Sequence, residues 1–194
     1  MSKKCILILG GARSGKSSFA QHLASQLGEK VLFVATAAGL DEEMKRRIEE
    51  HQKGRPKSWR TLESLTGVGK SIAEHGRDAQ VVIVDCVTLL INNVFEECKS
   101  SLGLEEVDED LLEKRVTAEM QELIACIGKL DASFVIVSNE VGSGLVPVTM
   151  VGRTYRDLLG KANQELARRS DQVYLMIAAI PIRMKPSLTL GNLS

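Results

Sequence analysis

Eight consecutive residues near the N-terminus have the composition of a phosphate-binding loop. They satisfy the pattern G-x-x-x-x-G-K-[ST], directly after an apolar run and directly before a helical pattern: Gly10-Gly11-Ala12-Arg13-Ser14-Gly15-Lys16-Ser17. Glycines allow backbone N–H groups to approach a polyphosphate closely. Lys16 is expected to neutralise β- and γ-phosphate oxygens, and the Ser17 hydroxyl is expected to ligate a bridging Mg²⁺. The segment therefore predicts binding of ATP or GTP with Mg²⁺.

A second acidic group is expected close to these phosphates. The apolar run Val81–Asp85 ends in a carboxylate, and such an aspartate holds the magnesium ion through its water shell in other P-loop proteins. Taken alone, Asp85 has an equally good explanation as the cap of the following helix. The phosphate loop favours the metal interpretation, so the predicted metal ligands are Ser17 and Asp85.

His51 stands between a helical pattern and a basic turn. It follows Met44 and Ile48 at helical spacing, which is typical of a core-facing histidine. The next residues, Gln52-Lys53-Gly54-Arg55-Pro56, end the helix and would hold phosphates close to the imidazole. A neutral imidazole facing an α-phosphate is a nucleophile. The pattern alone leaves both roles open for His51, packing and nucleophilic attack.

The elements that must position these residues alternate between short apolar runs and longer helical patterns. Strands are predicted at Cys5–Leu9, Val31–Ala35, Val81–Asp85, Phe134–Ser138 and Val173–Ile177. Helices are predicted at about Ser17–Leu27, Asp41–Gln52, Leu65–His75, Thr88–Cys98, Asp108–Leu130 and Val151–Arg169. Repeated βαβ units of this kind predict an α/β fold, a P-loop NTPase-like three-layer sandwich with a mainly parallel central sheet.

Composition restricts the class of protein further. The 194 residues include 25 basic and 25 acidic side chains, so no overall field attracts the chain to nucleic acid or to an anionic membrane. The N-terminal apolar run is too short for a signal peptide or membrane anchor. The four scattered cysteines are expected to be reduced, mostly buried thiols. We expect one cytoplasmic domain over residues 1–194, with a frayed tail from about residue 186.

Polar residues in the last third of the chain are expected near the carboxyl edge of the sheet, where open α/β folds bind ligands. They follow a strand end or line a helix: Asn139, Glu140, Arg153, Arg156 and Asn163. Surface salt bridges are the alternative for the two arginines. None of the five is assigned a catalytic role.

Several motifs in order resemble one known family, the bifunctional adenosylcobinamide kinase/adenosylcobinamide-phosphate guanylyltransferases. The resemblance runs from about Ile6 to Lys185. Its motifs are the phosphate loop, Ala35-Thr36-Ala37, Asp41-x-Glu43-Met44 leading to His51 and Gly54-Arg55-Pro56, Trp59-Arg60-Thr61-x-Glu63, Asp85-Cys86-Val87-Thr88, Ser138-Asn139-Glu140-Val141-Gly142 with Pro147, and Arg153-x-Tyr155-Arg156-Asp157-x-x-Gly160-x-x-Asn163-Gln164.

The resemblance implies two reactions on one scaffold. The first phosphorylates adenosylcobinamide with a nucleoside triphosphate, and the second transfers GMP from GTP to that phosphate through a GMP-histidine intermediate at His51. It also implies a homo-oligomer. Besides the phosphate loop, the nucleotide contacts it implies are Ala35, Thr36, Ala37, Gln52, Lys53, Gly54, Arg55, Glu63 and Asp85.

Three other functions are compatible with parts of the sequence. A P-loop small-molecule kinase without the guanylyltransferase step needs only the loop and Asp85. A regulatory GTPase is disfavoured because the guanine-reading Asn-Lys-x-Asp element follows no predicted strand. A non-enzymatic nucleotide-binding module would not turn over cobinamide.

Overall fold

The computed structural model describes residues 3–37, 56–102 and 108–186. A seven-stranded sheet with strand order β3-β2-β4-β5-β1-β6-β7 forms its centre. Neighbouring strands are parallel except for β7, which runs antiparallel to β6. The strands are β1 (Cys5–Gly10), β2 (Val31–Ala35), β3 (Arg60–Glu63), β4 (Val81–Asp85), β5 (Ser133–Val137), β6 (Gln172–Ile177) and β7 (Ile180–Lys185). The helices are α1 (Lys16–Leu27), α3 (Val68–His75), α4 (Val87–Leu102), α5 (Glu109–Lys129) and α6 (Met150–Arg169).

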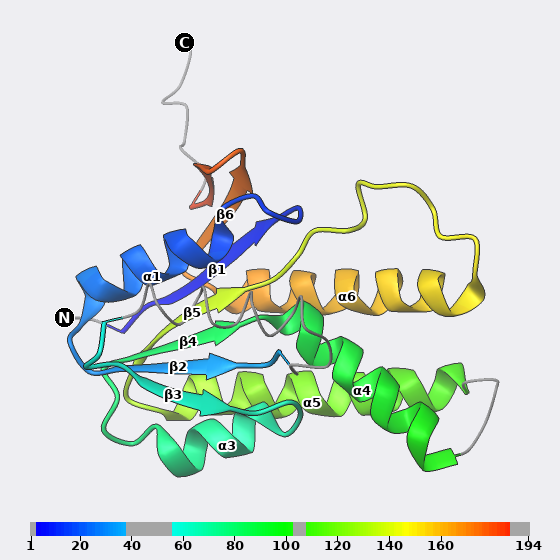
Figure 1. Ribbon diagram of the computed structural model, residues 1–194, viewed down its shortest axis with the longest axis horizontal. Coiled ribbons are helices and arrows are strands. Elements are labelled where there is room, and N and C mark those ends of the chain that lie inside the picture. Colours follow the sequence, from blue (N-terminus) through cyan, green and yellow to red (C-terminus); the bar gives the residue numbers. More distant parts are fainter. Residues whose placement is uncertain (1–2, 38–55, 103–107, 187–194) are drawn as a thin grey trace.

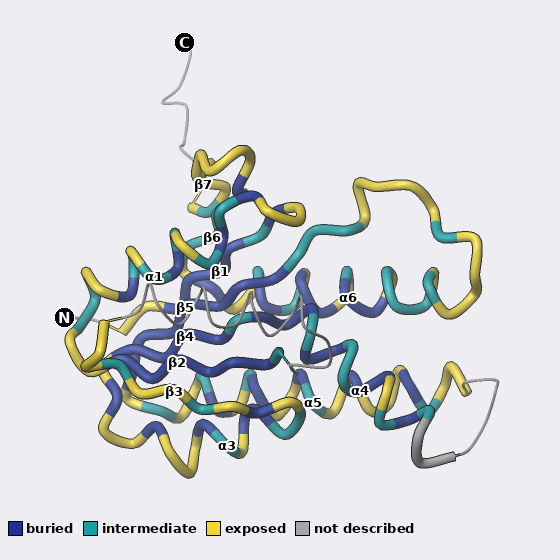
Figure 2. Tube along the Cα trace, viewed as in Figure 1, coloured by how far each residue is buried: buried dark blue, intermediate teal, exposed yellow. Residues whose placement is uncertain are grey.

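Helices cover both faces of the sheet, so the architecture is a three-layer sandwich (Figure 1). Helix α1 packs Ala20 and Ala24 against one face, together with strand residues such as Phe33. The other four described helices cover the opposite face in a larger apolar cluster. Burial is deepest in the central strands (Figure 2). The predicted P-loop NTPase-like sandwich with a mainly parallel sheet is therefore confirmed.

The buried strands follow from their composition. All five residues of β2 and all five of β5 are buried, as expected for strands that helices cover on both faces. All five predicted strands are present, with ends that differ by at most one residue. The predicted helix Asp41–Gln52 and the predicted tail beyond Pro186 lie outside the described residues.

Two edge strands were not predicted from the sequence. Strand β3 is short and mostly exposed, and β7 contains Pro181, so neither shows the apolar run of a buried strand. Proline is tolerated in β7 because an edge strand has a free side. Helix α3 starts at Val68 rather than at Leu65, because Glu119 of α5 accepts hydrogen bonds from the backbone N–H groups of Gly67 and Val68, both at 2.9 Å.

The cysteines are free thiols, and each is buried, as predicted. Burial, together with the negative charge of the neighbouring Asp85 carboxylate, raises the pKa of the Cys86 thiol to about 11. The thiol therefore stays neutral near pH 7. Within the described ranges, no helix is both long enough and apolar enough to cross a membrane.

Candidate nucleotide-binding site

The phosphate loop joins β1 to α1, as the motif requires. Strand β1 ends at Gly10 and α1 begins at Lys16. Gly10 and Gly15 have φ angles of 153° and 91°, which L-residues with side chains rarely adopt. A Cβ atom on Gly10 would lie 2.6 Å from the carbonyl oxygen of Met176. Glycine is therefore required at both positions by the conformation of the loop and, at Gly10, by a close neighbour.

Lys16 is buried inside the loop, with 7% of its surface exposed. Its Nζ donates a hydrogen bond to the carbonyl oxygen of Gly11 at 2.5 Å and lies 3.4 Å from Ser14 Oγ. Burial lowers the pKa of the Lys16 ammonium group, and the negative charge of the Asp85 carboxylate opposes that shift. A buried ammonium held by neutral oxygens is poised to pair with phosphate oxygens instead.

The turn between β6 and β7 supports the phosphate loop from the side. The backbone N–H of Ala179 donates a hydrogen bond to the carbonyl oxygen of Ser14 at 3.0 Å. A Cβ atom on Gly15 would lie 3.1 Å from Ala179 Cα. Ala178 and Ala179 adopt φ angles of 49° and 65°, so the turn is left-handed. Nothing in the loop motif indicates this contact, and it was not predicted.

Three of the predicted contact residues lie side by side across the sheet. Ala35 pairs with Glu63 on β3 and with Asp85 on β4, and Asp85 pairs with Val137 on β5. In the strand order, β2 lies three strands from β1, a separation of about 14 Å at the usual strand spacing. The row and the phosphate loop therefore lie along the same carboxyl edge of the sheet.

Thr36, which follows β2, forms hydrogen bonds with Cys86, which follows β4. Its side chain is fully buried, and Oγ1 donates to the carbonyl oxygen of Cys86 at 2.8 Å. Thr36 Oγ1 also accepts a hydrogen bond from the Cys86 backbone N–H at 2.7 Å, next to the cis Asp85–Cys86 peptide bond. The Thr36 side chain thus holds the strand ends together, while the half-buried Ala37 follows it in the chain.

The oxygen donors at the centre of the edge fit a magnesium ion. Ser17 begins the first turn of α1 beside Lys16, and Asp85 ends β4; both are half-buried. Asp85 ends β4, which pairs with β5, and β5 pairs directly with β1 of the phosphate loop. Magnesium in nucleotide sites needs only one or two protein oxygens, with phosphates and water completing its shell. In the described residues no cluster of three or more His, Cys, Asp or Glu side chains offers a closed metal cage.

A buried polar network fixes the segment that follows β5. Asn163 of α6 is 5% exposed; it accepts a hydrogen bond from Ser138 Oγ at 2.7 Å and donates one to the carbonyl oxygen of Asn139 at 3.0 Å. The backbone N–H of Glu140 donates to the Gly10 carbonyl oxygen at 3.1 Å. Asn163 therefore holds the β5 end against the phosphate loop, and its predicted place near the carboxyl edge is confirmed.

Replacing Asn163 with leucine is expected to lower the free energy of unfolding by about 2–4 kcal/mol. The change leaves the buried Ser138 Oγ and the carbonyl oxygen of the half-buried Asn139 without their hydrogen bonds to residue 163. Denaturant unfolding measures the effect. The matched variant Gln164→Leu, at an exposed neighbour on α6, is expected to change stability by less than about 0.5 kcal/mol. Equal effects of the two substitutions would contradict the role of the network.

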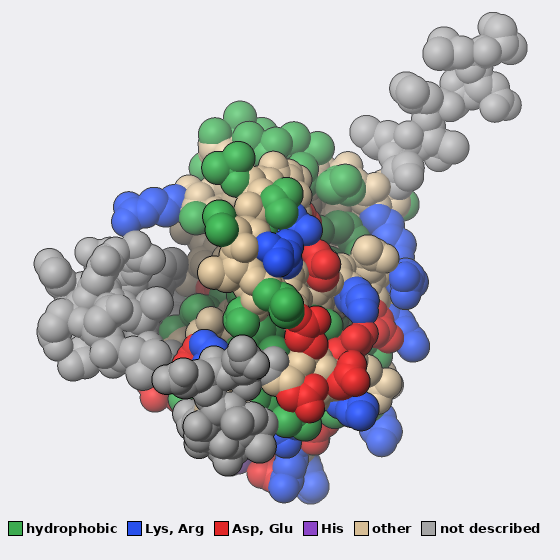
Figure 3. Space-filling model, turned by 90° about the vertical axis from the view of Figure 1, so that its right-hand side faces the viewer, with side chains coloured by type: hydrophobic (Ala, Val, Ile, Leu, Met, Phe, Trp, Pro, Cys, Tyr) green, Lys and Arg blue, Asp and Glu red, His purple; other side chains and the backbone are tan. Residues whose placement is uncertain are grey.

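Arg153 and Arg156, the two arginines of α6 that were predicted near the carboxyl edge, differ in role. Arg153 donates hydrogen bonds to the carbonyl oxygens of Pro147 and Val148, at 3.1 and 2.7 Å, and so fixes the end of the loop that precedes α6. Arg156 forms an ion pair with Asp157 at 3.2 Å. The loop presents Leu145 and Val148 with 97% and 94% exposure. Figure 3 views the molecule from the side on which this loop lies, and hydrophobic side chains gather on the upper part of that face.

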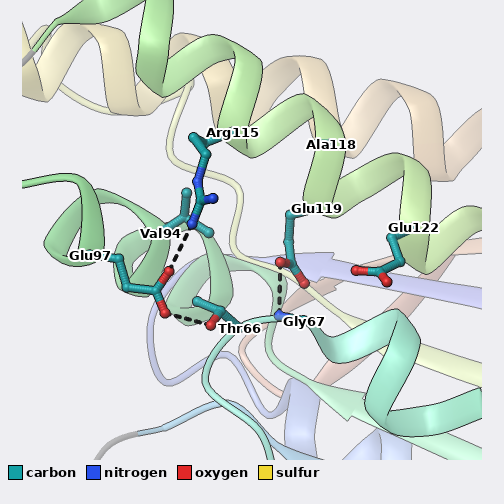
Figure 4. A pocket seen from close by; sticks show the side chains of 8 residues that line it. All are labelled: Thr66, Gly67, Val94, Glu97, Arg115, Ala118, Glu119 and Glu122. Atoms are coloured by element: carbon teal, nitrogen blue, oxygen red, sulfur yellow. Dashed lines mark hydrogen bonds and ion pairs between the residues drawn. The ribbon is translucent and has the colours of Figure 1, made fainter. Parts of the chain in front are cut away.

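A hollow of about 450 Å³ lies at the start of α3, between α4 and α5 (Figure 4). Its polar side chains bond to one another. Glu97 accepts from Thr66 Oγ1 at 2.5 Å and from Arg115 at 3.1 Å, and Glu119 caps α3. The side chains of Glu97 and Glu119 that line the hollow therefore hold the connection between β3 and α3, which follows Glu63 in the chain.

The remaining predicted contacts, His51 and the turn Gln52, Lys53, Gly54 and Arg55, lie outside the described residues. The structure thus brings together the phosphate loop, Asp85, the segment Ala35–Ala37 and Glu63.

This fold and this edge define a P-loop nucleotide-binding protein. Two solved ATPases of type III secretion systems have the same fold: EscN from enteropathogenic E. coli (TM-score 0.52, 12% identity, 91% of this chain and 43% of that one) and a prototypical ATPase from pathogenic bacteria (TM-score 0.53, 16% identity, 89% and 51%). This chain spans about half of each or less, and the likeness concerns the fold alone.

Sequence comparison identifies the family. The profile described as cobinamide kinase / cobinamide phosphate guanyltransferase matches residues 6–184, and the chain belongs to this family. The bifunctional adenosylcobalamin biosynthesis protein CobU of Escherichia coli K12 is 38% identical over 93% of this chain and 99% of its own length. The proteins of the same description from Salmonella typhimurium (CobU) and Pseudomonas aeruginosa (CobP) are 36% and 37% identical, over 93% and 92% of this chain and 99% and 96% of their own.

Proposed function

We propose that this protein phosphorylates adenosylcobinamide with ATP or GTP and then transfers GMP from GTP to the product, giving adenosylcobinamide-GDP and pyrophosphate. The observation that carries the proposal is a complete phosphate loop, with Asp85 and the Ala35–Glu63 pair on the same edge, in a chain whose family has both activities in its description. We treat the chain as one domain that performs both steps.

Phosphoryl transfer depends on positioning and on neutralisation of charge. The loop amides and Lys16 hold the β- and γ-phosphates, and Ser17 with Asp85 would hold Mg²⁺, which supplies further neutralisation of the developing charge. The substrate hydroxyl oxygen attacks the γ-phosphorus and releases its proton to solvent, the bond between the γ-phosphorus and the β-phosphate oxygen breaks, and the nucleoside diphosphate leaves. These residues suffice for a kinase.

Guanylyl transfer needs a nucleophile for the α-phosphorus. In the proposed step a nitrogen of His51 forms a bond to the α-phosphorus, and the bond to the β-phosphate breaks to release pyrophosphate. An oxygen of adenosylcobinamide phosphate then displaces the histidine nitrogen, which returns as free imidazole. Lys16 and the loop amides, which hold the β- and γ-phosphates, would stabilise the departing pyrophosphate.

One nucleotide site is proposed for both steps. The phosphate loop on β1 and the Glu63–Ala35–Asp85 row are separated by the width of a few strands, so a single triphosphate lies along the edge with its nucleoside toward β2 and β3. The residues proposed to contact it besides the loop are Ala35, Thr36, Ala37, Gln52, Lys53, Gly54, Arg55, Glu63 and Asp85.

The test is covalent labelling with GTP. The pure protein is incubated with Mg²⁺ and GTP labelled at the α-phosphate and is then denatured. An acid-labile, base-stable label on the protein is expected, because a phosphoramidate has that stability. GTP labelled at the γ-phosphate is the control and should leave no such label. If the protein phosphorylates cobinamide but takes up no label from α-labelled GTP, it is a kinase without the guanylyltransferase activity.

We also propose that the protein is a cytoplasmic homo-oligomer. Free buried thiols are typical of a reducing compartment. The β6–β7 hairpin carries a group of exposed apolar side chains of a kind that monomeric proteins rarely expose together. Their exposed fractions are 54% for Ile177, 64% for Ile180, 46% for Ile182 and 53% for Met184. The edge strand β7 also offers unpaired backbone groups to a second copy.

Replacing Ile182 with glutamate is expected to convert the oligomer to a smaller species, since a charge would be buried in the contact. Size-exclusion chromatography with light scattering measures the mass. Ala73→Glu, at an exposed position of α3, is the control and should leave the mass unchanged. A wild-type protein that is monomeric at all concentrations would contradict the proposal.

A further inference from the structure

One side chain of α4 joins the ends of two neighbouring strands. The side-chain amide of Asn93 donates hydrogen bonds to the carbonyl oxygen of Thr36 at 2.8 Å and to that of Leu65 at 3.0 Å. Thr36 directly follows β2, and Leu65 follows β3 by two residues. Both hydrogens of one NH₂ group are therefore used to hold two separate backbone segments.

These segments belong to the nucleoside half of the proposed site. Ala35 and Glu63 pair in register, and the backbone N–H of Ser64 donates to the Ala35 carbonyl oxygen at 3.0 Å. Ala35 and Glu63 are the last pair of the β2–β3 ladder, and Asn93 links the two segments just beyond it. The Asn93 amide thus links the segment after β2 to the segment after β3 beyond the last ladder pair.

The helix that carries Asn93 is itself a firm support. Glu97, one turn further along α4, accepts a hydrogen bond from Thr66 and is paired with Arg115 of α5 (Figure 4). Glu119 of α5 holds the start of α3. The β3–α3 connection is therefore fixed to α4 and α5, and Asn93 transmits that fixed position to the end of β2.

We infer that Asn93 is a positioning residue that sets the nucleoside-binding end of the site without touching the phosphates. The inference rests on the proposed function, because it needs a nucleoside triphosphate that spans the carboxyl edge. The phosphate loop follows β1, which β4 and β5 separate from β2, and the hydrogen bonds of Asn93 go to the segments after β2 and β3 and not to the loop.

This separation distinguishes positioning from a general contribution to stability. Loss of a structural contact weakens every ligand of the domain together with its stability. Loss of a nucleoside-positioning contact weakens GTP but not a ligand that consists of phosphates alone. Inorganic triphosphate with Mg²⁺ is such a ligand, since it offers the loop its phosphates and nothing to β2 and β3.

The experiment measures the dissociation constants of GTP and of inorganic triphosphate, each with Mg²⁺, by calorimetry on the full chain. In Asn93→Asp the amide donors become carboxylate oxygens that repel both carbonyls. GTP affinity is expected to fall at least about 10-fold, and triphosphate affinity less than about 2-fold. Asn93→Ala removes the donors without adding charge and is expected to show the same split. Asn92→Asp, which places the same charge on the adjacent half-buried residue, should change neither constant.

Three outcomes would overturn the inference. Equal weakening of both ligands, with a lowered melting temperature, would make Asn93 a structural residue. Unchanged GTP binding in both Asn93 variants would show that the strand ends need no such link. A wild-type protein that binds GTP no more tightly than inorganic triphosphate would refute the nucleoside site itself, and thus the proposed function as well.

Discussion

The variant His51→Ala is expected to lose the covalent GMP label and to lose guanylyl transfer by at least about 1,000-fold, the scale on which removal of a covalent nucleophile acts. Kinase activity toward cobinamide is expected to persist, because the proposed phosphoryl transfer needs only the phosphate loop, Ser17 and Asp85. The two steps are measured separately, the first with nucleotide labelled at the γ-phosphate and the second with GTP labelled at the α-phosphate. This result would show that guanylyl transfer requires His51 and that phosphoryl transfer does not.

His75→Ala is the matched control for this prediction. His75 lies on the exposed side of α3, where its Nδ1 is 2.9 Å from the carbonyl oxygen of Ser71. Its replacement should leave both the label and the kinase step intact. A label that survives in His51→Ala would assign the nucleophile to another residue and leave His51 with a packing role.

The variant Lys16→Ala is expected to reduce both reactions by at least about 100-fold. In the proposed mechanism the same ammonium group neutralises the γ-phosphate in the kinase step and the departing pyrophosphate in the transfer step, and a charged group of this kind contributes on that scale. The folded protein should remain at least as stable, because burial already lowers the Lys16 pKa and so disfavours the buried charge. Steady-state kinetics measures the rate of each step, and a thermal melt measures the stability of the variant.

Lys30→Ala, at an exposed lysine before β2, is the control and should change neither rate. A kinase step that survives in Lys16→Ala while guanylyl transfer is lost would show that the two reactions use different phosphate sites. A melting temperature that falls with the rates would attribute the loss to unfolding instead.

The core of the fold was predictable because burial on both faces demands apolar residues. Strands β2 and β4 were predicted with their observed ends, and every helix that falls within the described residues was predicted with boundaries a few residues off. Edge strands carry no such signal. β3 is held by its pairing with β2, and β7 by its pairing with β6, so only contacts distant in sequence define them.

The candidate site was predictable where a local motif carries the chemistry. The phosphate loop is contiguous in sequence, and its glycine conformations follow from its own residue types. Asp85 required one more step, from a strand end to a shared sheet edge. Its place in register with Ala35 confirms that step. The resemblance to the family added His51 and its basic turn, which stay predictions.

The sequence by itself determined the buried strands, the phosphate loop and the family, because each is encoded by contiguous residue types or by ordered motifs. Only the tertiary structure decided what holds the loop and the edge in place. These are the hydrogen bonds from Ala179 to Ser14, between Thr36 and Cys86, and from Asn93 to Thr36 and Leu65. The reason is physical. These bonds use backbone groups or ordinary polar side chains, whose partners are fixed by the packing of distant elements and not by any neighbour in the chain.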